Sequence, residues 1–288
     1  MHPLLSMMSD LPLIADGPVR CAMCRPLPDG PPAEALNVDR PETVAAAHRA
    51  FHAAGAGLHR TNTLGANALD LARHGLAERC EAINNSGSAA VRQAIGTEGI
   101  MMGSVGPIGA AVAGRPPPQA ERERAYSEQM IYLSDTGADV LVLEHFRSLA
   151  EAKLAVAVAG RVSDAPVLAL LALDARGRTA EGALPGEAAE GLLHEGAQGL
   201  GISCGPGGEA LSWAVGQISA LGPPVAVMLG VGSLGEPTSS SSQQPAERFA
   251  DALSELARQG AAIVGGCCGV APVHIEALAE RLGRAPKA

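Results

Sequence analysis

Aromatic residues and positive charge are both scarce in this chain. Its 288 residues include one Trp, two Tyr and three Phe, too few rings to build the stacking platforms that bind single-stranded nucleic acids. Acidic residues outnumber basic ones, the formal net charge is −9 at pH 7, and no basic stripe is visible. These properties exclude nucleic acids and anionic membrane surfaces as partners.

Long apolar stretches are absent as well. Runs such as residues 166–173 are too short to cross a bilayer, and the N-terminus lacks the basic start and apolar stretch of a secretory signal. Six cysteines, two of them adjacent, do not form the pattern of a disulfide framework in a chain of this size. The sequence therefore predicts a cytoplasmic protein whose cysteines are reduced.

Apolar residues themselves are plentiful, at 47% of the chain, and they follow a regular order. Short continuous apolar runs alternate with longer, alanine-rich amphipathic segments. Continuous runs are typical of parallel strands that are covered on both faces. The predicted strands are residues 11–16, 58–63, 99–104, 139–144, 166–173, 199–204, 224–229 and 261–265.

Amphipathic segments predict helices between these strands. The predicted helices are residues 41–54, 68–95 with a break near Gly75, 122–135, 149–160, 186–194, 209–220, 246–259 and 273–282. Eight strand–helix units indicate an α/β fold, a (β/α)8 TIM barrel forming a single domain over residues 1–288. An open, doubly wound sheet is the alternative, but no Gly-x-Gly-x-x-Gly follows the first strand. Two segments, 20–40 and 230–244, are rich in loop-forming residues.

Sulfur atoms gather at the predicted carboxyl ends of two strands. Cys204 ends one strand, and Cys267 and Cys268 follow another within a cluster of glycines. Active sites of (β/α)8 barrels form at this end of the barrel. Adjacent side chains of a regular strand point to opposite faces, but glycine allows the backbone to leave strand geometry. We therefore expect the three cysteines to bind one Zn²⁺, although small buried thiols are also common in cores.

The chemistry of such a site follows from its charge. Three thiolates and Zn²⁺ carry a net charge of −1, which makes the metal a modest Lewis acid. Such a zinc is suited to holding a further thiol as a nucleophilic thiolate near neutral pH. Zinc-bound hydroxide for hydrolysis more often accompanies histidine-rich or His/Glu ligand sets. The pattern thus favours methyl transfer to a thiol over hydrolysis.

Several segments together resemble the homocysteine-binding domain of the homocysteine S-methyltransferase family. The resemblance covers most of the chain and rests on residues 61–67 (Thr-Asn-Thr-Leu-Gly-Ala-Asn), 103–107 (Gly-Ser-Val-Gly-Pro), Leu143-Glu144, Cys204 and 265–269 (Gly-Gly-Cys-Cys-Gly). It implies a (β/α)8 barrel whose zinc is held by Cys204, Cys267 and Cys268 and completed by the thiol of homocysteine. Methionine would be the product.

The resemblance also implies roles for substrate-binding residues. Asp16 and Gly17 would help to hold the amino acid, Thr63 would line the pocket, and Glu144 would pair with the substrate ammonium. A buried carboxylate needs such a cation or other donors.

The chain departs from the family at three strand ends. The family usually has Asp-Gly-x-x-Gly-Thr after the first strand, where this chain reads Asp16-Gly17-Pro-Val-Arg20-Cys21. Arg20 could replace backbone donors in binding a carboxylate. His145 beside Glu144 is also unexpected, and residues 230–233 lack the asparagine that is common after the seventh strand. These changes leave the barrel and the zinc in place, but they call the identity of the thiol and of the donor into question.

The methyl donor is expected to be a free onium compound such as S-methylmethionine, since no folate- or cobalamin-binding domain is recognised in the chain. A methylated corrinoid on a separate protein is the next choice. Other hypotheses are a non-catalytic subunit or binding module, and a zinc hydrolase. Cys21 and Cys24 form a single Cys-x-x-Cys, a weak signal for a redox pair or second metal site.

Overall fold

The computed structural model describes residues 12–23, 31–108, 116–234 and 243–284. Eight parallel strands form one sheet in the order β1-β8-β7-β6-β5-β4-β3-β2, and a bridge between Ala15 and Leu58 brings its two edges together. The strands are β1 (Leu13–Ile14), β2 (Leu58–Arg60), β3 (Ile100–Val105), β4 (Val140–Phe146), β5 (Val167–Leu171), β6 (Gly199–Ser203), β7 (Val225–Leu229) and β8 (Ala261–Gly266). The predicted α/β barrel is confirmed.

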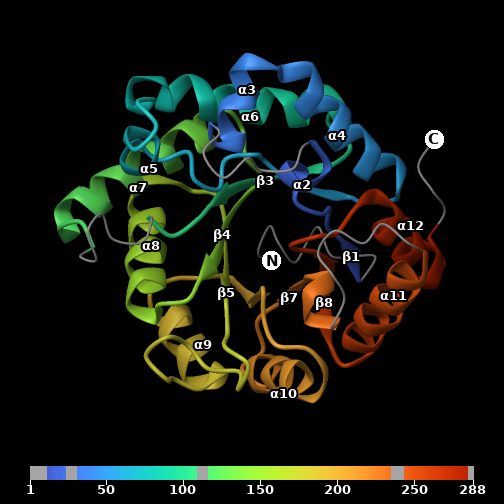
Figure 1. Ribbon diagram of the computed structural model, residues 1–288. Helices are drawn as coiled ribbons and strands as arrows, with labels where there is room; N and C mark the ends of the chain where they lie inside the picture. The colour runs from blue at the N-terminus through green and yellow to red at the C-terminus, as the bar shows by residue number, and fades with distance from the viewer. Residues whose placement is uncertain (1–11, 24–30, 109–115, 235–242, 285–288) are drawn as a thin grey trace.

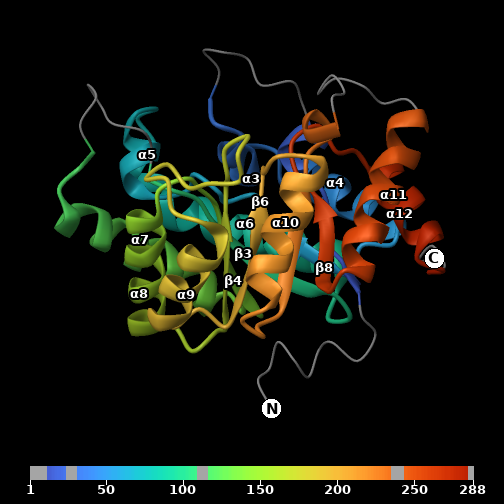
Figure 2. The ribbon, with the colours of Figure 1, turned by 90° about the horizontal axis from the view of Figure 1, so that it is seen from below.

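Helices form a ring outside the strands (Figure 1). They are α2 (Val19–Met23), α3 (Leu36–Asp39), α4 (Pro41–Ala53), α5 (Ala68–Ala72), α6 (Cys80–Ile95), α7 (Gln119–Asp135), α8 (Leu149–Val162), α9 (Pro185–His194), α10 (Gly208–Ser219), α11 (Gln243–Arg258) and α12 (Pro272–Arg281). Short 3-10 turns are η1 (Ala33–Ala35), η2 (Ala77–Arg79) and η4 (Val231–Leu234). Seen from the side in Figure 2, strands and helices run roughly side by side between the two ends of the barrel.

Two local expectations, the helix break near Gly75 and the loop-rich segment 20–40, can be compared with these bounds. The helical segment predicted over 68–95 breaks near Gly75, where the backbone φ of +69° suits glycine. Ser148 caps α8 by accepting a hydrogen bond from the backbone N–H of Glu151. The segment 20–40 was expected to be a loop, but its described part contains α2, η1 and α3, because Met23 and Leu36 pack against the core between the strands and the helices.

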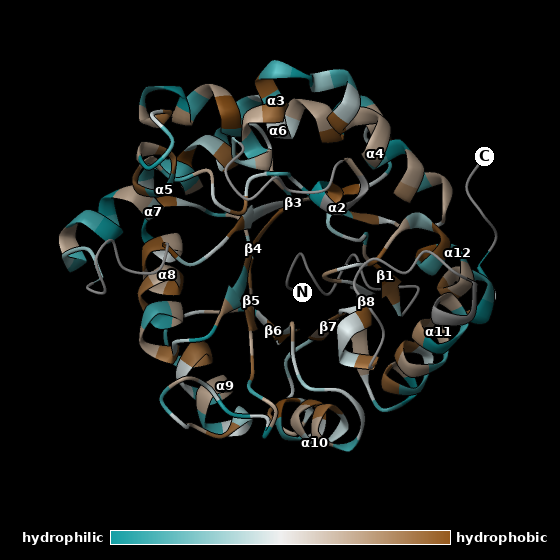
Figure 3. Cartoon of the chain, viewed as in Figure 1, coloured by the Kyte–Doolittle hydropathy of each residue, from teal (hydrophilic) through white to brown (hydrophobic). Residues whose placement is uncertain are grey.

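The core has two layers, as expected for a barrel. Inside the strands lies a cluster that includes Leu58, Met102, Val142, Leu168 and Met228. A larger cluster fills the space between the strands and the helices. Figure 3 shows the same division, with brown helix faces turned toward the strands and teal faces outward. None of the helices among the described residues is long and apolar enough to span a membrane.

The barrel interior leaves no room for an added methyl group at Gly201 on β6, because a Cβ there would overlap the backbone of Ala226 on β7. Gly216 on α10 has open space at the same position. We expect Gly201→Ala to lower the free energy of unfolding by about 1–3 kcal/mol through overpacking. Gly216→Ala should raise it by about 0.5–1 kcal/mol through helix propensity. Urea unfolding at equilibrium measures both, and equal effects would contradict this packing.

Candidate metal and substrate site

The site begins with an irregularity in β4. Along this strand Val140 and Val142 face the barrel interior, while Leu141 and Leu143 pack toward the helices. The register with β5 then shifts between Leu143 and Phe146, and His145 adopts a φ of +69°. A bulge of this kind re-aims side chains. It brings Glu144 and His145 to the mouth of the barrel together, although they are adjacent in the sequence.

A buried arginine connects several strands at this mouth. Arg60, at the end of β2, is 5% exposed. Its Nε donates to Asp16 Oδ1 at 2.9 Å and one terminal nitrogen donates to Glu144 Oε2 at 2.9 Å. The other donates to the carbonyl oxygens of Asp16 and Gly266 at 2.8 and 2.7 Å. Burying a charge is costly unless it is paired and hydrogen-bonded, and here every arm of the guanidinium has a partner.

Glu144 receives further support from β3. The hydroxyl of Ser104 donates to Glu144 Oε1 at 2.6 Å. Burial alone would raise the pKa of Glu144, but the charges of Arg60 and His145 and the hydrogen bonds from Ser104 and Arg60 outweigh it and hold that pKa below its ordinary value. Glu144 is therefore an ionised carboxylate at the base of the site.

The three predicted zinc cysteines meet beside this network. Cys204 follows β6 with a φ of +55°, and Cys267 and Cys268 follow β8. Cys268 Sγ lies 3.7 Å from Cys204 Sγ and 3.9 Å from Cys267 Sγ. The sulfurs of Cys204 and Cys267 are in direct contact, as in a disulfide. Since zinc binds thiolates, it requires this pair in the reduced state.

The donor set fits zinc. In a tetrahedral site with Zn–S bonds of about 2.3 Å, two sulfurs stand about 3.8 Å apart. Both distances from Cys268 Sγ match that separation. Zinc would therefore be held by Cys204, Cys267 and Cys268.

His145 lies directly against the sulfurs. Its Nε2 is 3.6 Å from both Cys204 Sγ and Cys267 Sγ, and the side chains of His145 and the three cysteines form one group of metal-binding type. The backbone N–H of His145 donates to the hydroxyl of Ser203 on β6. Burial lowers the pKa of His145, against the opposing effect of the Glu144 carboxylate. A lowered pKa favours the neutral form of the ring, in which one nitrogen keeps its lone pair.

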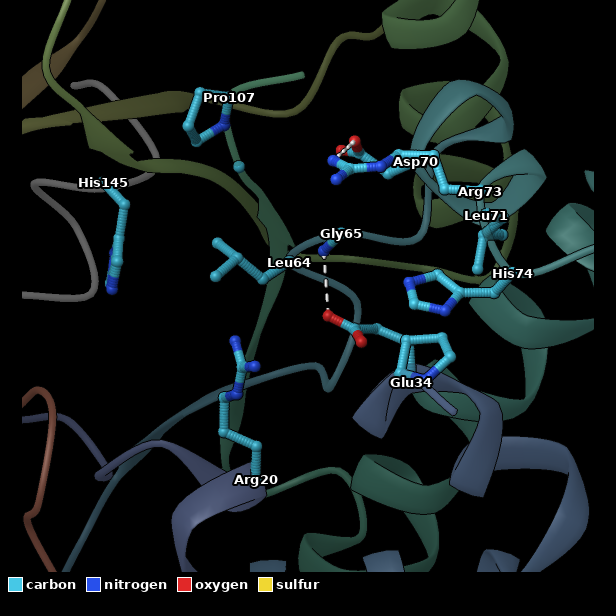
Figure 4. Close-up of a pocket in the computed structure, with 12 residues that line it drawn as sticks. Arg20, Glu34, Leu64, Gly65, Asp70, Leu71, Arg73, His74, Pro107 and His145 are labelled. Atoms are coloured by element: carbon cyan, nitrogen blue, oxygen red, sulfur yellow. Dashed lines mark hydrogen bonds and ion pairs between the residues drawn. The ribbon is translucent and has the colours of Figure 1, made fainter. Parts of the chain in front are cut away.

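A cavity of about 370 Å³ opens onto this cluster. Its lining includes Gly17, Arg20, Glu144, His145 and Cys268. A neighbouring cavity shares Arg20, His145 and the Leu64 side chain with it. Figure 4 shows the His145 imidazole across from Leu64, with Arg20 reaching toward the same space. An acidic and a basic side chain therefore face one pocket beside the sulfurs.

Two expected pocket residues lie elsewhere. Asp16 is not part of the cavity lining, because its carboxylate is turned to Arg60. Thr63 is also outside the lining, because its hydroxyl donates to the carbonyl of Ser104 and contacts that of Thr61. Both side chains therefore bond to residues next to the pocket, Asp16 to Arg60 and Thr63 to Ser104. Cys24 and the side chain of Cys21 lie outside the part of the chain that the structure describes.

Sequence reasoning missed Arg60. The residue stands at the end of an apolar run, in Leu58-His59-Arg60-Thr61. A charged residue at a strand end of a barrel is rarely buried without a partner, so the position itself was a signal. Its partners, Asp16 and Glu144, are 44 and 84 residues away, which no local pattern reveals.

We expect Arg60→Met to lower the free energy of unfolding by about 3–5 kcal/mol, because it leaves two carboxylates buried beside each other without their cation. The matched control is Arg79→Met, which removes the exposed pair of Arg79 with Asp39 and should cost under about 1 kcal/mol. Chemical denaturation at neutral pH compares the two. A loss no larger for Arg60 than for Arg79 would contradict the role given to Arg60.

Known proteins resemble this chain over nearly its whole length. Methionine synthase of Mycobacterium tuberculosis is 30% identical over 261 residues, which are 85% of this chain and 22% of that protein. The chain therefore spans about a fifth of the length of the methionine synthases it matches. Betaine–homocysteine S-methyltransferase 1 of Mus musculus is 28% identical over 280 residues, covering 88% of this chain and 67% of that protein.

Solved structures agree on the fold. The metallated form of the homocysteine methyltransferase MmuM from Escherichia coli superposes with a TM-score of 0.81 at 22% identity, covering 97% of this chain and 100% of that one. The family model for homocysteine S-methyltransferase matches residues 13–282. This span includes β1, the last cysteines and every strand between them. The chain belongs to the homocysteine S-methyltransferase family.

Proposed function

We propose that this protein is a zinc-dependent methyltransferase that moves a methyl group to a thiol, with homocysteine as the acceptor and methionine as the product. The observation that carries the proposal is the convergence of Cys204, Cys267 and Cys268 at a cavity that Cys268 itself lines. When bound, zinc would keep the acceptor sulfur a thiolate near neutral pH. Membership of the family supports the same reaction.

The pocket residues would position the acceptor. Arg20 would bind the carboxylate of the amino acid through paired hydrogen bonds. Glu144 would accept from its ammonium, because a carboxylate offers about four lone-pair sites, and Ser104, Arg60 and the nearby His145 leave acceptor capacity. Gly17 lines the same pocket, and packing requires glycine there because a Cβ would meet the ring of Phe51 at 2.8 Å.

The transfer itself is a displacement. The thiolate sulfur forms a bond to the methyl carbon as the bond from that carbon to the donor breaks, and the donor leaves with the electron pair. A sulfur or nitrogen onium donor departs neutral, so acid catalysis is not needed. The negative charge of the thiolate cluster attracts a cationic donor, which favours an onium such as S-methylmethionine or betaine, the compound named in the mouse relative. A methyl-corrinoid is the second donor class.

We expect the zinc-loaded protein to form methionine from homocysteine with at least one donor among S-methylmethionine, betaine and methylcobalamin, as measured by chromatography of the product. A chelator should abolish the reaction, and added Zn²⁺ should restore it. Cys268→Ser should lose zinc and lower the rate at least about 100-fold. This loss is larger than the one expected from removing a residue that only hydrogen-bonds to a metal ligand.

The matched control is Cys80→Ala. Cys80 is buried, and its thiol donates to the carbonyl of Ala66, in a cluster separate from the site. This variant should keep one zinc per chain and its activity. Complete zinc loading with no methyl transfer from any of the three donors would sink the proposed function and favour a binding module.

A further inference from the structure

A nitrogen atom of His145 already lies at the fourth position of the proposed zinc site. His145 Nε2 lies 3.6 Å from each of two cysteine sulfurs. In a tetrahedral shell with Zn–S near 2.3 Å and Zn–N near 2.0–2.1 Å, a nitrogen stands about 3.6 Å from each sulfur. Both measured distances match this value, as the sulfur–sulfur distances from Cys268 match theirs. Four of the contacts in the cluster thus have the lengths of edges of one S₃N tetrahedron.

The second ring nitrogen is oriented as in other metal-binding histidines. His145 Nδ1 lies 3.7 Å from Glu144 Oε2, and it is buried without a hydrogen bond. Ligating histidines commonly direct their other nitrogen toward a carboxylate, which sets the tautomer and the ring orientation. With the proton on Nδ1, the lone pair of Nε2 faces the sulfurs.

The backbone holds this arrangement at a cost. Among the described residues, the non-glycine residues with positive φ are His145 and Cys204, and both belong to the cluster. Each such residue is strained by about 1–2 kcal/mol, and strain of this kind concentrates where a ligand or substrate is bound. The Ser203 hydroxyl, which accepts from the His145 backbone N–H, ties the two strained strand ends together.

A shell of three cysteines and one histidine is closed, whereas a catalytic zinc keeps a position for its substrate. We propose that His145 is an exchangeable fourth ligand, bound to zinc in the absence of the acceptor and displaced by the incoming thiolate. This inference rests on the proposed function for the second half of the exchange. His145 gives up its Zn–N bond as the Zn–S bond forms, and the thiol proton is released to water, as metal binding generally releases protons.

The structure provides room for the displaced ring. His145 lines both neighbouring cavities, and its side chain is 25% exposed. Figure 4 shows the imidazole and Leu64 facing each other across the cavity that both line. A rotation of the side chain can therefore vacate the metal without movement of the barrel. With His145 bound, the zinc would keep four ligands when no acceptor is present.

The test is zinc-edge X-ray absorption on the full chain, with and without homocysteine. Without the thiol, we expect three sulfurs and one nitrogen with the outer-shell pattern of an imidazole. With homocysteine, we expect four sulfurs and no imidazole pattern. His145→Gly should lose the imidazole pattern and regain it when free imidazole is added. Glycine is chosen because it tolerates the backbone φ of +69° at this position. His194→Ala, which changes an exposed histidine on α9, should behave as the unmodified protein.

Calorimetric titration provides a second readout. If the His145 imidazole occupies the fourth position of the zinc nine-tenths of the time, it competes with homocysteine. His145→Gly should therefore bind homocysteine about tenfold more tightly than the unmodified protein. If His145→Gly fails to fold, His145→Asn serves instead, since asparagine tolerates this backbone region. The inference is overturned if the unmodified protein shows no imidazole without thiol, or if the imidazole persists beside a fourth sulfur.

Methyl transfer measured on the same samples separates the two proposals. If methionine forms but no imidazole is ever seen on the metal, the role of His145 is wrong and the proposed function stands. If the imidazole is present but homocysteine neither replaces it nor is methylated, the proposed function fails, the exchange fails with it, and His145 remains a structural ligand.

Discussion

The buried guanidinium of Arg60 is the interaction on which the mouth of this barrel depends. It bonds to Asp16 after β1, to Glu144 on β4 and to the carbonyl of Gly266 on β8. Four strands that are distant in the sequence are thus joined at one point. A buried charge with hydrogen-bonding partners on every arm is costly to break, because removing one member leaves the others uncompensated. The network therefore sets where each of these strand ends lies.

The site of chemistry is built on this frame. Gly266 is one residue before Cys267, and Glu144 is one residue before His145. Two of the strands that Arg60 joins therefore also carry two members of the candidate metal-binding cluster. Strained residues persist only where their surroundings over-determine them. The strain at His145 and Cys204 is sustained by the network on one side and by the Ser203 hydrogen bond on the other.

Much of the fold could be predicted because its signals are local. Continuous apolar runs mark buried parallel strands, and Ser148 followed by Glu151 marks the start of α8. The glycines around Cys267 and Cys268 indicated a departure from strand geometry, and the structure brings both sulfurs to Cys204. The end of β4 was less predictable. The strand was expected to end at Glu144, but it continues through His145 to Phe146, because a bulge depends on pairing with β5 and not on residue type.

The sequence by itself determined the barrel, and it singled out the three cysteines proposed to bind zinc and a carboxylate at the end of β4. These follow from periodicity and from chemically distinctive residues, which do not depend on their neighbours in space. Only the tertiary structure decided that Arg60 bonds to both Asp16 and Glu144, that the Thr63 hydroxyl bonds to the Ser104 carbonyl, and that His145 faces the sulfurs. Those outcomes arise from contacts between residues 40 to more than 200 positions apart, where direction and distance are set by the closed barrel and not by any local pattern.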